Sequence, residues 1–381
     1  MKKCTRKWIE DQWLFQCLLS IQDPRIPGRC LYPLINILFI SLCALLSGCD
    51  EWKSIELFGN KRKRWLSQFI DLSNGIPSAK TFARVFSLIV PEEFERCLML
   101  WMSQLCQLLT YDIVNIDGKT SRGSCCDAQK KRADHIVNAY SPRLKATMGQ
   151  VKTPNKSNEI KGIPILLKQL NIVSCIVSMD AMGTQKGIAN LIREKKAHYV
   201  LALKKNHKRF YRRVSHLFHN ADRLDYQGMV TQWSETKDYG HGRIEKRSYT
   251  MLPMMYLAQY KKKWRDLSAF IRVISVRETT RGIETSTRYY ITSLPWHHHK
   301  KMAATIREHW RIENTLHWKL DVGLNEDASQ IWQGHAARNL SVMRKIVLKL
   351  LEDENSSSKG TALKRLEAAL DIRYLRKVVG F

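Results

Sequence analysis

The spacing of apolar residues in the first part of the chain is helical. The run Leu34–Leu46 is almost wholly apolar, as in a buried core helix, and apolar positions recur every three to four residues from Trp52 to Phe69. Ser78 follows a turn marked by Asn74, Gly75 and Pro77, and it is expected to cap the next helix. A further helix is expected from about Pro91 to Leu109. Residues 1–110 are therefore predicted to form a helical N-terminal domain.

The spacing changes to that of strands at Tyr111. The run YDIVNID ends at Asp117, the runs HIVNAYS and KATMGQVK follow, and the apolar run IVSCIVSMD ends at Asp180. A continuous apolar run is typical of a central strand that is covered on both faces. Asp117 and Asp180 are thus expected at the carboxyl ends of strands, where α/β sheets commonly bind ligands. An Asp-Gly turn at Asp117 and Gly118 remains the alternative.

The remaining pattern divides the chain further. Strands and helices alternate over residues 111–229, which predicts the first part of an α/β core, and residues 230–295 return to strand-like spacing rich in Arg and Lys. Residues 296–351 are helical again, and Glu313 lies there on a predicted helix beside Trp310, Leu316 and His317. Residues 352–381 are expected to form a basic tail.

Charge adds a partner class to this outline. Among 381 residues, 63 Lys and Arg stand against 35 Asp and Glu, a net charge of +28 with a pI near 9.8. Such an excess favours a polyanion, with nucleic acid the first candidate and an anionic membrane surface the weaker one. The run Leu31–Gly48 is interrupted by polar residues and is too short to span a bilayer. Glu10 and Asp11 precede any apolar run, which argues against a signal peptide.

The cysteines indicate a reducing compartment. All ten lie between Cys4 and Cys175, and no two are spaced as CxxC. Zinc sites and disulfide frameworks use other spacings, so free thiols in the cytoplasm are expected.

Three acidic residues could form one site if the strands are neighbours. Asp117, Asp180 and Glu313 offer oxygen ligands without His or Cys, a set that suits magnesium or manganese rather than zinc. Two such ions can activate a hydroxyl nucleophile and stabilise the leaving oxygen in phosphoryl displacement. With the basic charge, this chemistry indicates DNA as substrate.

The motifs around these residues resemble the ISAs-type insertion-sequence transposases, which include the H-repeat-associated proteins linked to Rhs elements. The resemblance covers nearly the whole chain, and its landmarks are YPLINILFISLCALLSGCDEW, NGIPSAKTFARVF, IDGKTSRGS, GQVKTPNKSNEI, MDAMGTQKGIA, YVLALKKNH, HGRIEKR and HWRIENTLHWKLDV followed by NEDAS. It implies an α/β fold with a ribonuclease-H-like mixed-sheet core and a β-rich insertion before the catalytic helix. It also implies a DDE triad, carried here onto Asp117 of IDGK, Asp180 of MDAMG and Glu313 of WRIEN.

The resemblance implies partners and cofactors as well. It implies Mg²⁺, with Mn²⁺ as an alternative, and double-stranded DNA of element ends and target. A homodimer in a synaptic complex and a bacterial cytoplasmic location, nucleoid-associated when DNA is bound, follow in the same way. The helical N-terminal domain is then expected to bind DNA or mediate association. The side chains expected at DNA are basic and lie near the strand ends or the Glu313 helix: Lys119, Arg122, Lys204, Lys205, Lys208, Arg243, Arg307, Arg311 and Lys319.

The chain departs from the broader DDE pattern around the glutamate. Where related proteins often carry Tyr, Arg and Lys, this chain has Ile306, His309 and Leu320. An inactive DNA-binding remnant of a mobile element therefore stays open beside an active transposase. A structure-selective nuclease, which cuts without joining, is the third hypothesis.

Several other residues have competing interpretations. His297, His298 and His299 are expected in a loop at a helix start rather than on a metal. Glu326 and Asp327 are interpreted as groups that support the site or cap a helix. Trp233 is expected in a core, with stacking on an unpaired base as the alternative. The motif His241–Arg243 fits a DNA contact or a hairpin turn.

Overall fold

The computed structural model describes residues 13–106, 112–125, 133–153, 159–240, 243–280 and 282–380. Its first part is helical, as the spacing predicts. Ser78 caps α5, because its hydroxyl accepts a hydrogen bond from the Thr81 amide at 3.3 Å. The helices of this block are α2 (Trp13–Leu19), α3 (Leu34–Leu46), α4 (Trp52–Leu66), α5 (Ala79–Leu88) and α6 (Pro91–Cys106).

The chain then forms a mixed sheet in the order β3-β2-β1-β4-β5-β9-β8-β7-β6. β1 runs antiparallel to β2 and parallel to β4, and β4 runs parallel to β5. The bounds of these core strands are β1 (Ile113–Ser121), β2 (Asp134–Ser141), β3 (Ala146–Thr153), β4 (Ile176–Met179) and β5 (His198–Leu203). The order 3-2-1-4-5 is that of a ribonuclease-H-like core, so the expected α/β fold class is confirmed.

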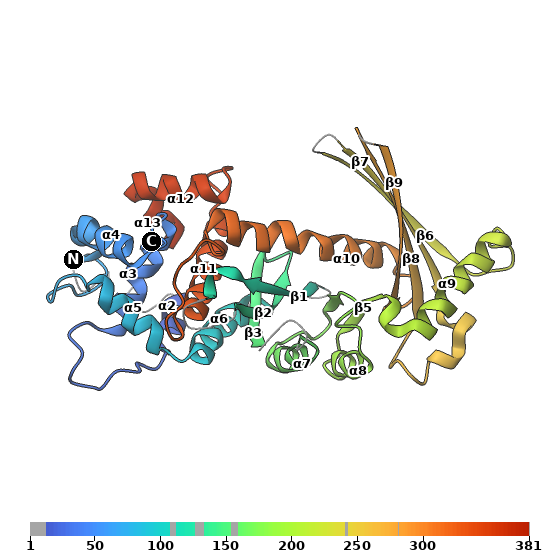
Figure 1. Ribbon diagram of the computed structural model, residues 1–381, viewed down its shortest axis with the longest axis horizontal. Helices are drawn as coiled ribbons and strands as arrows, with labels where there is room; N and C mark the ends of the chain where they lie inside the picture. Colours follow the sequence, from blue (N-terminus) through green and yellow to red (C-terminus); the bar gives the residue numbers. More distant parts are fainter. Residues whose placement is uncertain are drawn as a thin grey trace.

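Helices cover both faces of this core. α7 (Glu159–Gln169), α8 (Lys186–Glu194) and α9 (Lys208–Arg223) pack on one face, around Val177, Tyr199 and Leu201. α10 (His299–Ile312) packs on the other, around Ile176 and Val200. Figure 1 shows α7 and α8 below the strands and α10 running across them from above. This double coverage explains why these strands are continuous apolar runs.

The β-rich segment continues the core sheet instead of forming a separate one. β9 pairs with β5, so β6 (Gln232–Gly240), β7 (Arg243–Pro253), β8 (Ala269–Thr279) and β9 (Gly282–Thr292) extend its edge. Figure 1 shows these long strands projecting beyond the helices. Their ends are exposed because nothing in the described chain covers them there. Trp233 on β6 is 71% exposed, so the expectation that it lies in a core is wrong.

The helix that carries Glu313 continues beyond α10. Two π-helical turns, η6 (Glu313–His317) and η7 (Lys319–Gly323), follow it directly. α11 (Ala336–Asp353), α12 (Thr361–Leu370) and α13 (Ile372–Val379) then return to the N-terminal helices, where Leu340 and Leu375 join the same core as Ile37. No helix within the described ranges is long and apolar enough to cross a membrane.

One local expectation is wrong. β1 does not end at Asp117, since pairing with β2 carries it on to Ser121. The Asp-Gly turn is excluded by the same pairing, in which Gly118 lies opposite Val137.

Candidate active site

The register of two parallel strands places Asp117 beside Asp180. Ile116 of β1 lies opposite Met179 of β4, where β4 ends. The next residue of each strand is an aspartate, and paired residues of parallel strands point to the same face of the sheet. Asp117 and Asp180 therefore lie side by side on the same face of the sheet. β1 continues past Asp117 to Ser121, whereas β4 ends at Met179, just before Asp180.

Glu313 reaches the same place from the end of α10. A cavity of about 590 Å³ lies between the strand ends and this helix. Asp117, Asp180 and Glu313 all line it. Its other walls are Ala202, Leu203, Lys204, Lys205, Tyr211, Thr287, Arg288, Tyr289, Tyr290, His309, Trp310 and Ile312. The structure thus brings the three predicted carboxylates to one cavity, together with two of the basic residues expected at DNA.

The surroundings of Asp117 disfavour a negative charge on it. The pKa of Asp117 rises from 3.8 to about 7, first because the group is buried and also because Asp180, Glu159 and Glu313 repel its charge. A hydrogen bond from the Gly118 amide lowers the Asp117 pKa, but it offsets only part of this rise. Asp180 is held by the amides of Met182 at 2.9 Å and Gly183 at 3.2 Å.

The donor set fits a hard divalent cation. Carboxylate oxygens are the ligands of magnesium and manganese, and a cation relieves the repulsion that raises the Asp117 pKa. In the chain as described, no three His, Cys, Asp or Glu side chains already stand in a metal-ligating group. The cavity supplies the charge and the ligand type, and Asp117, Asp180 and Glu313 would hold the ion.

Gly118 is required by a buried pair behind the strand. His135 Nε2 and Glu159 Oε1 lie 2.6 Å apart, and Thr120 contacts the other ring nitrogen of His135 at 2.9 Å. A Cβ at Gly118 would stand 2.3 Å from Glu159 Oε1 and 2.6 Å from His135 Nε2. The glycine of IDGK therefore allows this pair to support the backbone beside Asp117. Sequence reasoning missed His135 and Glu159, which no spacing connects to the triad.

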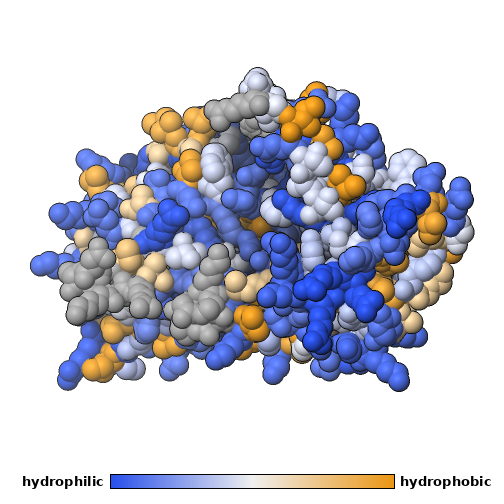
Figure 2. All heavy atoms as spheres, turned by 45° about the vertical axis from the view of Figure 1, so that its right-hand side comes forward, coloured by the Kyte–Doolittle hydropathy of each residue, from blue (hydrophilic) through white to orange (hydrophobic). Residues whose placement is uncertain are grey.

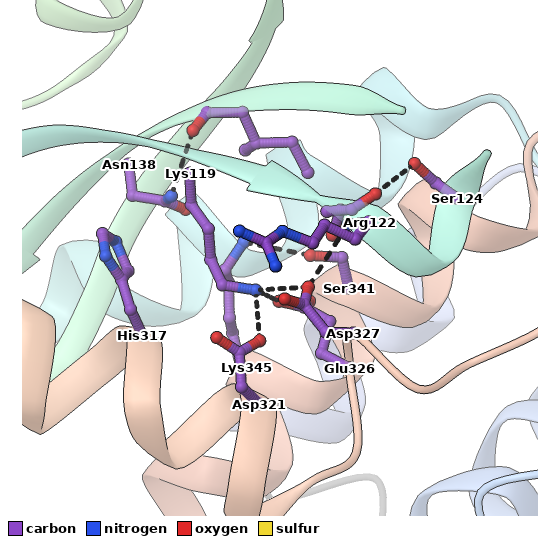
Figure 3. Close-up of polar contacts among 12 residues, drawn as sticks. Lys119, Arg122, Ser124, Asn138, His317, Asp321, Glu326, Asp327, Ser341 and Lys345 are labelled. Carbon is purple, nitrogen blue, oxygen red and sulfur yellow. Dashed lines mark hydrogen bonds and ion pairs between the residues drawn. The ribbon is translucent and has the colours of Figure 1, made fainter. Parts of the chain in front are cut away.

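Lys119 is part of a buried ion-pair network (Figure 3). Its Nζ lies 2.6 Å from Asp321 Oδ1, 2.7 Å from Glu326 Oε2 and 3.4 Å from Asp327 Oδ1. The Lys119 side chain is only 9% exposed. The structure thus places this amine in the interior, where its charge is taken up by carboxylates rather than offered to DNA. Glu326 and Asp327, interpreted as supporting groups, hold Lys119 rather than line the cavity.

The charges of this network stabilise one another. Burial alone lowers the pKa of Lys119, but Glu326 and Asp321 outweigh burial and raise it. Burial likewise raises the pKa of Glu326, yet Lys119, Lys345 and Arg344 lower it to about 2. Both groups are therefore ionised at neutral pH. Pairing of this kind is needed because an isolated buried charge costs several kcal/mol.

The network aligns β1 with the helix that carries Glu313. Asn115, Asp117 and Lys119 lie on one face of β1, since they alternate along the strand. Asn115 Nδ2 donates to the Glu308 carbonyl at 2.9 Å, and Asp117 Oδ2 lies 3.9 Å from His317 Nδ1. Lys119 then meets Asp321 one helical turn beyond His317. These contacts fix how far Glu313 stands from Asp117.

The other residues expected at DNA have varied surroundings. Lys208 and Arg122 are exposed. Three are engaged in ion pairs: Arg307 with Asp238 at 3.0 Å, Arg311 with Glu308 at 2.8 Å, and Lys319 with Glu352. The side chain of Arg243 and the residues His241 and Gly242 lie outside the described part. Figure 2 shows that the face of the molecule that includes the projecting strands is largely hydrophilic.

A second cavity of about 1010 Å³ adjoins the first one. It lies between α10 and strands β6 to β9, and it shares Arg288, Tyr290, Trp310 and Glu313 with the carboxylate cavity. The Arg288 guanidinium stacks 4.2 Å over the Trp310 ring, and Trp310 is 42% exposed. The two cavities are therefore continuous past Glu313.

Comparisons with known proteins identify the family of the chain. The family described as Transposase DDE domain matches residues 109–350, and the family described as DDE_Tnp_1-associated matches residues 15–102. The chain is 38% identical to the putative transposase YncI of Escherichia coli O157:H7 over 374 residues, which is 97% of this chain and 94% of that protein. It is 34% identical to the H repeat-associated putative transposase YhhI of Escherichia coli K12, over 96% of this chain and 97% of that protein.

Two further similarities are more limited. The inactive transposase YbfQ of Escherichia coli K12 is 40% identical over 65 residues, which is 17% of this chain and 77% of that protein. A solved piggyBac transposase synaptic complex with hairpin DNA aligns with all of this chain and 82% of its own, at 9% identity and a TM-score of 0.37.

Proposed function

Because the chain belongs to the Transposase DDE domain family, we propose that it cleaves and joins DNA strands with Asp117, Asp180 and Glu313. The observation that carries the proposal is the single cavity that these carboxylates line, next to Lys204 and Lys205. The residues come from β1, β4 and the end of α10, which are far apart in the chain. Their meeting is a product of the fold and matches the chemistry expected of the family.

The side chains have separate roles in this proposal. Asp117, Asp180 and Glu313 would hold Mg²⁺ or Mn²⁺, which would supply the positive charge needed to activate the nucleophile and stabilise the leaving oxygen. Lys204 and Lys205 neutralise a DNA phosphate at the cavity edge. The network around Lys119 keeps β1 and the Glu313 helix in register. The tight packing behind Gly118 keeps the Asp117 backbone in place.

Each chemical step exchanges one phosphorus–oxygen bond for another. In cleavage, a water oxygen bonds to phosphorus and the bond to the 3′ oxygen breaks. The 3′ oxygen takes up a proton and leaves as a hydroxyl, while the phosphate remains on the 5′ end. In joining, that 3′-hydroxyl attacks a target phosphodiester and expels a target 3′ oxygen. The number of phosphodiester bonds is unchanged by joining.

The substrate in this proposal is double-stranded DNA, at element ends and at the target. The net charge of +28 supports it, because phosphate neutralisation supplies most of the affinity of DNA-binding proteins. A homodimer that holds two ends together, in a bacterial cytoplasm and associated with the nucleoid, completes the proposal. The helical N-terminal block contributes DNA binding or association.

The direct test is nicking of a DNA duplex that carries the matched element end, in the presence of Mg²⁺. Wild type is expected to nick, and Asp180→Asn is expected to lose nicking while it retains DNA binding. Asp225→Asn is the matched control, since Asp225 is an exposed loop residue. Equal nicking by wild type and Asp180→Asn would refute the triad.

A second function is favoured by two buried residues. Ile306 and Leu320 stand where related proteins often have Tyr and Lys, and both are packed in apolar cores, 2% and 0% exposed. Neither can contact DNA, so the chain could be a DNA-binding remnant without cleavage, as the name of YbfQ says of that relative. Salt-sensitive binding with no nicking under any divalent metal would establish this function. Nicking without joining would instead indicate a structure-selective nuclease.

A further inference from the structure

His309 lies at the wall of the carboxylate cavity, one helical turn before Glu313. Its ring is held in place by a chain of hydrogen bonds that begins on β1. Asn115 Nδ2 donates to the carbonyl of Glu308 at 2.9 Å. A carbonyl can only accept, so the orientation of the Asn115 amide is fixed. Its Oδ1 is therefore an acceptor.

The next link fixes the hydroxyl of Ser178. Ser178 Oγ lies 2.7 Å from Asn115 Oδ1 and must donate to it, because that oxygen carries no proton. A serine hydroxyl has a single proton. Toward His309 Nδ1, at 3.0 Å, the Ser178 oxygen can consequently only accept. The proton in this contact belongs to His309 Nδ1.

The chain thus determines the tautomer of His309. A neutral imidazole that carries its proton on Nδ1 has a bare lone pair on Nε2. The ring is neutral, since burial lowers its pKa to about 4. The charge of Asp180 raises this pKa in part, and the charge of Lys204 lowers it. His309 lines the cavity, and Ser178 occupies its Nδ1, while no hydrogen bond joins its Nε2 to another residue within the described ranges. Nε2 therefore presents an acceptor at the carboxylate cavity.

An acceptor selects a different ligand atom from a donor. A phosphate oxygen of the DNA backbone carries no proton and cannot bond to a bare lone pair. Water and a sugar 3′-hydroxyl both carry one. An arginine at this position would have only donors and would bind phosphate instead.

We propose that His309 is a further catalytic residue, whose Nε2 accepts a hydrogen bond from the hydroxyl nucleophile and orients its oxygen toward the scissile phosphorus. The nucleophile is water in cleavage and the 3′-hydroxyl in joining. The imidazole gains no proton in this role; it fixes the direction of the O–H bond. This inference rests on the proposed function for its substrate, but the tautomer can be tested without it.

The tautomer is measured by ¹⁵N NMR of the protein labelled in histidine, with the His309 signals identified by their loss in His309→Gln. The expected result is a protonated Nδ1 and an unprotonated Nε2. Ser178→Ala removes the acceptor for the Nδ1 proton, and it is expected to shift His309 toward the Nε2-protonated tautomer. A wild-type ring protonated on Nε2 overturns the inference, whether or not the protein cleaves DNA.

The catalytic role is measured by nicking together with DNA affinity. His309→Ala is expected to slow nicking about 10²-fold, the scale of a misoriented nucleophile, with unchanged DNA affinity. His309→Arg is expected to lose nicking as well, although the added charge strengthens DNA binding. His216→Ala, at an exposed histidine of α9, is the matched control. Wild-type nicking by His309→Arg would show that the position contacts phosphate and would overturn the proposal.

A double mutant separates this role from a structural one. If Ser178 acts through the His309 tautomer, Ser178→Ala slows nicking in wild type and has no further effect in His309→Ala. Independent, additive losses in both backgrounds contradict the proposal. If wild type itself fails to nick, the proposed function is wrong, while the NMR result still decides which nitrogen of His309 carries the proton.

Discussion

Replacing Lys119 with methionine removes an ammonium group that pairs with three carboxylates. Methionine keeps most of the length and volume of the side chain, so the change acts mainly on charge. Glu326 is then left with its side chain 3% exposed and without the partner at 2.7 Å. Asp321 and Asp327 are each 30% exposed, so water screens their charges in part.

The expected loss of stability follows mainly from Glu326. Removing one member of a buried ion pair costs about 3–5 kcal/mol, because the remaining charge stays buried. Lys345 and Arg344 also lower the Glu326 pKa, which places the expectation at the lower end of that range. Converting Glu326 to Gln in the Lys119→Met background removes the stranded charge. That double mutant is expected to be more stable than Lys119→Met alone.

The assay is urea unfolding followed by circular dichroism at pH 7, with DNA affinity measured over a range of salt concentrations. Lys208→Met is the matched control, because Lys208 is an exposed basic residue at the start of α9. It is expected to change stability by less than about 0.5 kcal/mol. It is also expected to reduce the salt slope of binding by about one unit, as loss of a phosphate contact does. Lys119→Met showing the behaviour of Lys208→Met would refute the buried network.

Two further predictions concern the Asp117 strand. The pKa of Asp117 in the folded protein is about 7, against an ordinary 3.8, so the folded protein loses stability as pH rises through that interval. Asp117→Asn should therefore raise the thermal midpoint more at pH 8 than at pH 5. An equal gain at both pH values would contradict the burial of this charge. Gly118→Ala should destabilise the protein by about 1–3 kcal/mol and impair nicking, because the added Cβ meets Glu159 and His135. Gly187→Ala is the control, since no atom lies within 4 Å of its added Cβ, and it should do neither. Urea unfolding and nicking assays measure both variants.

The spacing of apolar residues predicted much of the fold, because that spacing depends on which faces of a strand or helix are buried. α3 occupies Leu34–Leu46 as expected, since an almost wholly buried helix needs no polar face. The apolar runs of β4 and β5 likewise reflect helices on both faces of the sheet. Where an element ends was less predictable. β1 passes through Asp117 because β2 supplies hydrogen-bond partners, and that pairing is not a local property.

The sequence alone could not show whether a given polar or aromatic side chain is buried or exposed. Lys119 and Lys208 are both lysines in polar stretches, yet one is enclosed by acidic residues some 200 positions away and the other is exposed. The same is true of Trp233, because its exposure depends on whether another part of the described chain packs on β6. The tautomer of His309 on α10 is a further case, since Asn115 on β1 and Ser178 on β4 determine it.

The sequence by itself determined the fold class, the family resemblance and three carboxylates as candidates, because hydrophobic period, strand-forming runs and motifs are local and leave direct marks in the chain. The tertiary structure decided which charges meet. It set Asp117 level with Asp180 through strand register and brought Glu313 to the same cavity. It enclosed Lys119 and left a lone pair on His309 facing the cavity. Coulomb and hydrogen-bond energies depend on distance and burial, and folding alone fixes both.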